Sequence, residues 1–287
     1  MCAAPPGCGA AERLRDTDFT PRPELDTICV VKTPYSPLLR CIFALLALLA
    51  ALPCRAEMVE VSQRLPSGAE IVSQRFPAAG KILAVWLTDE RSAEEEKAAA
   101  DMAAQGTEIW LTDCLTPYFL PLLPSSWNQV PVRDMSDWLE ILRRQNPEKR
   151  IVLIANGRVS TLALRMASDW HGRHADVVPN PLAGALLMWP LLYQELLPGQ
   201  EPDYDPVVRL THLNLVILQP KSSAGYWWRE RLKGFLEGAG SRVWMNVLPG
   251  LRDGFYGRGD NTPQEISAQA HLGELLLDAL KPLTDPL

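Results

Sequence analysis

The sequence predicts an α/β fold: a mostly parallel central sheet with an N-terminal antiparallel hairpin and helices on both faces. Short apolar runs alternate with helical segments along most of the chain. The central runs are apolar throughout, as strands covered on both faces are, and do not alternate between apolar and polar residues. Two segments that do alternate, within Glu57–Ala79, come before them and are joined at Pro66-Ser67-Gly68, which predicts a hairpin.

The other helices and strands are predicted from local sequence patterns. Ser92 precedes an alanine-rich stretch with Glu95 three residues later, which is a helix-capping pattern, and Gly106 ends that helix. Proline at 263 opens the last helix, which is expected to run to about Leu280. The expected order is a strand at 81–88, a helix at 92–105, a strand at 108–112, a proline-rich loop at 113–133, a helix at 135–144, a strand in 182–193, a short cap in 194–211, a strand at 213–218, a helix at 226–237, a strand at 242–248 and a loop at 249–262.

One stretch organises the chain: Arg150–Arg165, with the sequence RIVLIANGRVSTLALR. Residues 151–154 predict a buried strand, Ala155-Asn156-Gly157 predicts a tight turn, and 160–168 predict a helix. In an α/β sheet such a turn lies at the carboxyl edge of the strands, where binding and catalytic groups are placed. We therefore expect the functional site at this edge.

The composition of the chain argues against one class of function, nucleic-acid binding. The chain has 287 residues with a formal net charge of −6, and 22% of its residues are charged. An acidic chain lacks the basic face that general nucleic-acid binding needs, so nucleic acid is not expected as a partner. Residues 57–287 are predicted to form a single domain.

The N-terminal part predicts a leader and a secretory signal at 1–56. The unbroken apolar run Cys41–Leu52 follows Lys32 and Arg40, and it is too short to span a bilayer comfortably. Cys54-Arg55-Ala56 offers a cleavage site after Ala56, which predicts a periplasmic or secreted protein with membrane contact only through an uncleaved leader. The residues before 30 resemble no part of a signal, and a misassigned start codon would explain them. A lipoprotein or membrane anchor is the alternative.

Cleavage would remove five of the six cysteines and leave only Cys114. The mature chain then has no intramolecular disulfide and no cysteine-based metal cluster. The histidines are also not spaced as metal ligands on one helix face, so no metal site and no cofactor are expected.

The order of elements, the length and the turn at 155–157 resemble the α/β-hydrolase family over nearly the whole predicted mature chain. In that family the turn is a nucleophile elbow, G-x-S-x-G, followed along the chain by an acid and a histidine. On this sequence the elbow reads Ala155-Asn156-Gly157-Arg158-Val159, so Gly157 takes the place of the nucleophile. The acid position falls in 219–223, around Ser222, which contains no carboxylate. The histidine position falls at Asp253 or Arg252.

The loop that would hold an oxyanion also departs from the family. It reads Thr88-Asp89-Glu90-Arg91, and carboxylates there repel a developing negative charge. Ser160 and His271 are the fallback candidates for nucleophile and base, although a helix first-turn serine and a packed or surface histidine are the simpler interpretations.

Two hypotheses result. The favoured one is an exported α/β-hydrolase-fold protein without a Ser-acid-His triad, serving as a binding or accessory protein of the bacterial envelope for a small molecule or an envelope protein. The other is a hydrolase of ester or peptide-like bonds with a rearranged set, in which Ser160 is the nucleophile and Asp253 or His271 the base. In the first case the ligand would contact polar and aromatic residues of the sheet edge, namely Asp89, Asn156, Arg158, Trp227 and Arg252.

Overall fold

The computed structural model describes residues 57–89, 91–193 and 200–284. The predicted leader and signal lie outside these residues, as does Glu90 of the predicted oxyanion loop. Within the described part, no helix is long and apolar enough to cross a membrane.

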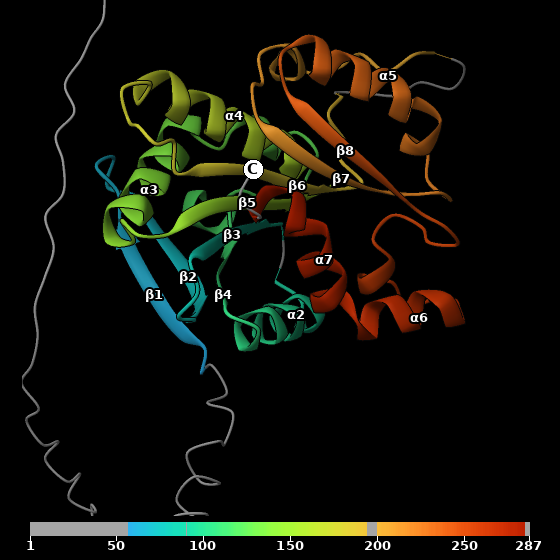
Figure 1. Ribbon diagram of the computed structural model, residues 1–287, viewed down its shortest axis with the longest axis horizontal. Helices are drawn as coiled ribbons and strands as arrows, with labels where there is room; N and C mark the ends of the chain where they lie inside the picture. The colour runs from blue at the N-terminus through green and yellow to red at the C-terminus, as the bar shows by residue number, and fades with distance from the viewer. Residues whose placement is uncertain (1–56, 90, 194–199, 285–287) are drawn as a thin grey trace, which may run out of the picture. The chain divides into compact units, whose positions relative to one another are not determined.

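A sheet of 8 strands, in the order β1-β2-β4-β3-β5-β6-β7-β8, forms the centre of the fold (Figure 1). The strands are β1 (Val59–Arg64), β2 (Glu70–Phe76), β3 (Ile82–Thr88), β4 (Thr107–Asp113), β5 (Arg150–Asn156), β6 (Leu182–Met188), β7 (Asn214–Pro220) and β8 (Arg242–Leu248). The β1–β2 and β2–β4 pairs are antiparallel, and every pair from β4 to β8 is parallel. The predicted fold class, including the hairpin, is confirmed.

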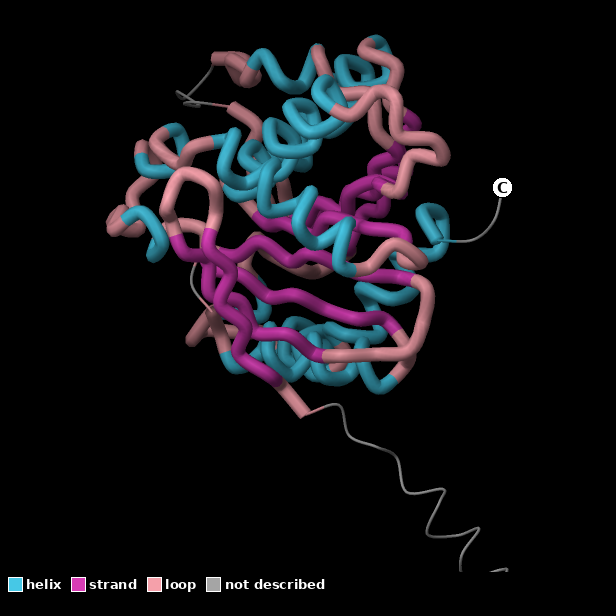
Figure 2. Tube along the Cα trace, turned by 90° about the vertical axis from the view of Figure 1, so that its left-hand side faces the viewer, coloured by secondary structure: helices cyan, strands magenta, loops and turns pink. Residues whose placement is uncertain are grey.

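Helices cover the sheet on both faces, as Figure 2 shows. The longer helices are α2 (Ala93–Ala104), α3 (Val132–Gln145), α4 (Val159–Arg173), α5 (Gly225–Gly238), α6 (Pro263–Ala270) and α7 (Leu272–Thr284). Side chains from α3, α4 and α5 pack in one hydrophobic cluster, and those of α2 and α7 pack in a second cluster. The parallel strands carry apolar side chains on both faces because each face meets a layer of helices.

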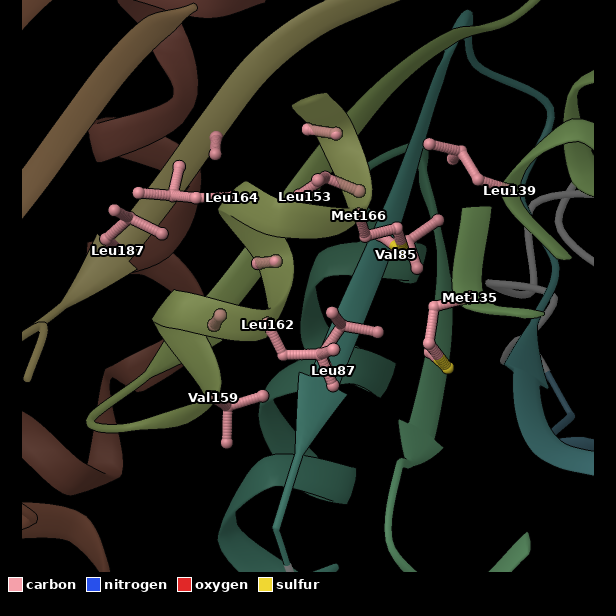
Figure 3. Packing of buried hydrophobic residues seen from close by; sticks show 14 of the residues in the cluster. Val85, Leu87, Met135, Leu139, Leu153, Val159, Leu162, Leu164, Met166 and Leu187 are labelled. Carbon is pink, nitrogen blue, oxygen red and sulfur yellow. The ribbon is translucent and has the colours of Figure 1, made fainter. Parts of the chain in front are cut away.

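The helix after the central turn is held by this packing. Figure 3 shows Leu162 of α4 beside Leu87 of β3, with Met166 close to Val85. All four side chains are buried. Full burial of such a side chain stabilises the folded state by about 1.5–3 kcal/mol, so α4 and the turn that precedes it are fixed firmly on β5 and β3.

Some boundaries differ from the sequence prediction. The predicted final helix is two helices, because α6 ends at Ala270, with His271 as its C-cap, and α7 starts at Leu272. Gly273 lies against the backbone of Ala98 in α2, where an added Cβ would come within 3.0 Å of the carbonyl oxygen of Ala98. A side chain at 273 would therefore push α7 away from α2. The predicted loop at 113–133 contains two short 3-10 helices, η1 (Thr116–Tyr118) and η2 (Ser126–Asn128).

Cys114 follows β4 and is buried. Burial raises the pKa of its thiol well above the ordinary value of 9.0, and nearby Asp113 and Asp89 raise it further. The thiol therefore stays protonated and out of contact with water, which is the behaviour of a small core residue.

Candidate functional site

The turn between β5 and α4 places Gly157 at the carboxyl edge of the sheet. Strand β5 continues through Asn156, and Gly157 has a φ of +45°. This left-handed conformation favours glycine, and it also occurs at the strained serine of a nucleophile elbow. The amide of Gly157 donates to the carbonyl of Met188 at 3.0 Å, and the amide of Leu191 donates to the carbonyl of Gly157 at 2.9 Å. The backbone is thus shaped as an elbow that carries no side chain.

The space above Gly157 is open. An ideal Cβ at this position would lie 3.7 Å from Nε1 of Trp189 and 3.9 Å from its Cδ1, which are ordinary contact distances. Glycine is therefore not required here by crowding. Only the positive φ opposes a larger residue, and it does so modestly.

A cleft of about 800 Å³ lies over this turn. Its lining comes from the segment after β3, the start of α2, the loop around η2, the central turn, the segment after β6 and the loop after β8. Charged, polar, aromatic and aliphatic residues line it, among them Asp89, Arg91, Glu94, Glu95, Leu122, Leu123, Pro124, Trp127, Asn156, Gly157, Arg158, Trp189, Leu191 and Tyr256. A concave site of this size at a strand carboxyl edge is typical of small-molecule binding.

A buried polar network forms one wall of the cleft. The hydroxyl of Tyr256 donates to Oε1 of Glu95 at 2.9 Å, and Nδ2 of Asn156 donates to the Tyr256 hydroxyl at 2.7 Å. Thr88 donates through Oγ1 to Oε2 of Glu95 at 2.9 Å. Glu95 is only 2% exposed. These contacts tie together the end of β3, the start of α2, the end of β5 and the loop after β8.

Burial changes the acidity of this network. Desolvation raises the pKa of Glu95 from 4.5 to about 7, against the hydrogen bonds from Tyr256 and Thr88 that lower it, and the charge of Asp89 raises it further. Burial also raises the pKa of Tyr256 well above 10.0, and the charge of Glu95 adds to that effect. The tyrosine therefore stays protonated as the donor, while Glu95 exchanges a proton near neutral pH.

Trp189 forms the wall next to Gly157. It is 7% exposed and has a φ of +38°, an uncommon conformation for a residue with a large side chain. Its ring packs on Phe255 and Tyr256, with centroid distances of 5.7 Å and 5.4 Å. Its amide donates to the carbonyl of Leu218 at 2.8 Å. These contacts hold the strained backbone and fix the indole over the turn.

The predicted ligand-binding residues divide into two groups. Asp89, Asn156 and Arg158 line the cleft, and Nη1 of Arg158 donates to the carbonyl of Tyr193 at 3.3 Å. Trp227 does not line the cleft and is 80% exposed on α5. Arg252 does not line it either, since its guanidinium is engaged in anchoring the loop after β8.

That anchoring contact joins Arg252 to helix α6. Arg252 donates from Nε and Nη2 to the two carboxylate oxygens of Glu265, at 2.8 Å and 2.6 Å, and from Nη1 to Asp260 at 2.9 Å. Glu265 also closes the capping box with Thr262 at the start of α6. The pKa of Glu265 is held well below its ordinary value, first by the hydrogen bond from Arg252. This ion pair fixes the loop after β8, which carries Tyr256, to helix α6.

The segments after β7 and β8, where the sequence comparison placed an acid and a histidine, contact each other: the amide of Ser222 donates to the carbonyl of Leu251 at 3.1 Å. Ser222 is exposed after β7, and its neighbour Ser223 accepts a hydrogen bond from Gln219 at 2.6 Å. Burial raises the pKa of Asp253 from 3.8 to about 6, while a hydrogen bond with Ser223 lowers it. The Ser223 hydroxyl itself donates to the carbonyl of Pro220 at 2.8 Å, and Oδ1 of Asp253 has no hydrogen-bond partner among the described residues. Neither Ser222 nor Asp253 lines the cleft at Gly157.

The fallback residues lie elsewhere. Ser160 is in the first turn of α4 with a fully buried side chain, and its Oγ has no hydrogen-bond partner among the described residues. His271 is exposed at the end of α6 and binds the carbonyl of Ser267 through Nδ1. All four histidines of the chain lie in the described part, at 171, 174, 212 and 271, and none lines the cleft. No group of three or more metal-ligating side chains occurs in the described ranges.

Sequence reasoning missed three cleft residues: Glu95, Trp189 and Tyr256. Glu95 was interpreted as a helix-capping residue, Trp189 as part of an apolar run and Tyr256 as part of a loop. A signal existed only for Trp189 and Tyr256, which follow the predicted carboxyl ends of two strands.

No family model matches the sequence, and no curated protein matches it. The structure is similar to solved structures of known enzymes. An esterase of Pyrobaculum calidifontis has a TM-score of 0.54 and 12% sequence identity, covering 85% of this chain and 99% of that one. A hormone-sensitive lipase from a metagenome library has a TM-score of 0.55 and 17% identity, over 85% and 92%. Carboxyl esterase 2 of Tuber melanosporum has a TM-score of 0.58 and 11% identity, over 80% and 89%.

This chain therefore has the α/β-hydrolase fold, as the resemblance implied. The similarity extends over nearly all of the described domain and over most of each neighbour. At these identities it establishes the fold alone.

Proposed function

We propose that the protein is an exported binding or accessory protein of the bacterial envelope, which keeps the α/β-hydrolase fold without its hydrolytic chemistry. The observation that supports this most directly is Gly157. It has the position and the positive φ of an elbow nucleophile but no side chain. The cleft above it remains open, so the site is suited to holding a ligand that is not converted.

The missing base supports the same proposal. Serine hydrolysis needs a nucleophile, a base in hydrogen-bond reach and a group that orients the base. No histidine lines the cleft, and Ser160 has a fully buried side chain. The titratable group that the cleft does contain, Glu95, already accepts hydrogen bonds from Thr88 and Tyr256.

The alternative is a hydrolase of ester or peptide-like bonds with a rearranged set. The similar structures named above are esterases and lipases, which supports a hydrolase. In this alternative Ser160 acts after a local opening of the first turn of α4, with Asp253 or His271 as base.

Labelling separates the two functions. We expect no stoichiometric labelling of the purified protein by a fluorophosphonate probe and no turnover of short-chain p-nitrophenyl esters, with an active serine esterase as positive control. Gly157→Ser is expected to gain no turnover, because a hydroxyl there still lacks a base. Labelling of a serine, together with turnover that Ser160→Ala or Asp253→Asn abolishes, would establish the alternative instead.

A further inference from the structure

The cleft offers a specific donor for a ligand, and this inference rests on the proposed binding function. We propose that the cleft takes an uncharged small molecule with an apolar tail, whose carbonyl oxygen accepts a hydrogen bond from Nε1 of Trp189 in the space left open by Gly157. The ligand class is thus a neutral carbonyl compound, such as a primary amide of medium chain length.

The donor is the first reason. Indole nitrogen can only donate a hydrogen bond, and a buried Trp usually has a partner for it. Trp110, Trp138 and Trp170 find such partners in Glu108, Gln63 and Glu140. Trp189 is 7% exposed and donates from Nε1 to none of the described residues. Nε1 of the fully buried Trp86 also lacks an acceptor, but Trp86 does not line the cleft. Trp127 lines the cleft too, and what distinguishes Trp189 is its position next to Gly157. Because Trp189 lines the cleft, a ligand can supply the missing acceptor.

The geometry is the second reason. Nε1 of Trp189 lies 3.7 Å from the place of a Cβ at Gly157, so it faces the volume that a nucleophile's side chain would fill. The fold holds Trp189 at a positive φ, and backbone strain of this kind clusters at functional sites. The strained backbone and the ring contacts with Phe255 and Tyr256 keep the donor in this one orientation.

Charge is the third reason, and it disfavours an anionic ligand; a cationic ammonium group is disfavoured because it has no acceptor for the indole N–H. Three carboxyl groups, of Asp89, Glu94 and Glu95, line the cleft against the two guanidinium groups of Arg91 and Arg158. Asp89 and Glu95 already repel each other enough to affect the acidity of Glu95. A ligand carboxylate would add another negative charge beside them with no surplus of positive charge to offset it.

Exposed apolar side chains in the cleft are the reason for proposing a ligand with an alkyl tail. Leu122 and Leu123 line the cleft and are 54% and 52% exposed. Leu191 and Trp127 continue this surface toward the turn. An alkyl chain laid across these side chains would remove their apolar area from water while the carbonyl end reaches Trp189.

The probes are hexanamide, hexanoate and hexylammonium, which share an alkyl chain and differ in the charge and acceptor of the head group. Binding is followed by the indole N–H resonances of the full chain labelled with ¹⁵N, and Trp189→Phe identifies the resonance of Trp189. We expect hexanamide to shift this resonance and to bind more tightly than either charged probe.

Two variants test the contact itself. Trp189→Phe keeps a ring against Phe255 and Tyr256 but removes the donor, and it should weaken hexanamide binding about 5-fold, as expected for one neutral hydrogen bond of about 1 kcal/mol. Trp227→Phe, on the exposed face of α5, is the matched control and should leave binding unchanged. Gly157→Ala fills the open space and should also weaken binding, with its circular dichroism spectrum confirming that it folds.

Each result is decisive. The inference is overturned if hexanamide binds without shifting the Trp189 resonance, if hexanoate or hexylammonium binds more tightly than hexanamide, or if no probe perturbs a cleft residue. None of these outcomes touches the proposed function, which the fluorophosphonate and ester assays judge separately. Turnover of an ester in those assays would overturn the proposed function itself.

Discussion

At the scale of single residues, the cleft contains a carboxyl group whose surroundings are unusual. Glu95 is buried beside Tyr256, and its pKa is raised from 4.5 to about 7. In the unfolded chain the same group ionises near pH 4.5. Between pH 4.5 and 7 the folded protein therefore holds a proton that the unfolded chain has released, so stability contributed by the protonated form falls as pH rises through this window.

The variant Glu95→Gln tests this linkage. Glutamine keeps the size and an acceptor oxygen but cannot ionise, so its stability should lack this part of the pH dependence. Relative to the wild type, we expect Glu95→Gln to gain up to about 3 kcal/mol of unfolding free energy between pH 4.5 and pH 8. Urea denaturation at several pH values measures the difference. Glu94→Gln, on the same helix turn, is the control, and an equal pH dependence in both variants would contradict the assignment.

At the scale of elements, the site depends on how the chain segments around it begin and end. Helix α2 begins at Ser92, whose hydroxyl accepts from the amide of Glu95 at 3.1 Å. The cap therefore fixes the turn that carries Glu95 into the cleft. The loop after β8 is fixed in a similar way by Arg252 and Glu265, so Tyr256 reaches Glu95 from a fastened segment.

Removing the cap should loosen this side of the site. Ser92→Ala leaves the Glu95 amide without its acceptor, and we expect a loss of about 1 kcal/mol of unfolding free energy. Ser222→Ala, at an exposed position that caps no helix, should change stability by less than about 0.5 kcal/mol. Chemical denaturation of both variants checks the expectation, and equal stabilities would contradict the capping role.

An element could be predicted where its own local sequence determines it, and could not where contacts between distant segments determine it. Strands β3 to β8 were predictable because their apolar runs are local, and the cap at Ser92 was predictable from its spacing to Glu95. The break at His271 was not, because no proline or glycine stands at that position to indicate it. The tight turn at Gly157 was predictable from its local sequence, but the pairing of Glu95 with Tyr256 was not, since 161 positions separate them in the chain.

At the scale of the whole molecule, the described domain begins with a hairpin that the predicted processing leaves intact. Strand β1 begins at Val59, after the predicted cleavage site at Ala56. The hairpin is anchored in the sheet through the β2–β4 pairing. Removal of the leader therefore takes away no strand of the sheet.

The proposed export can be tested directly. Expressed with its leader in a Gram-negative host, the protein should be recovered from the periplasm with a mass that corresponds to a chain starting at Glu57. Fractionation followed by intact-mass measurement checks this. A variant with Ala56→Arg should accumulate as the precursor. Recovery of the unprocessed wild-type chain from the cytoplasm would contradict the signal assignment, without bearing on the cleft.

Cys114 gives the domain a useful experimental property. Its thiol is covered by the core, and burial holds the pKa of the group far above neutral. An alkylating reagent can then react only while the surrounding structure is open, so the rate of modification reports how often that part of the core opens. Residues 57–287 contain one cysteine, so no incorrect disulfide can form within that chain when it refolds in air. The same thiol reports the rate of structural opening without any engineered label.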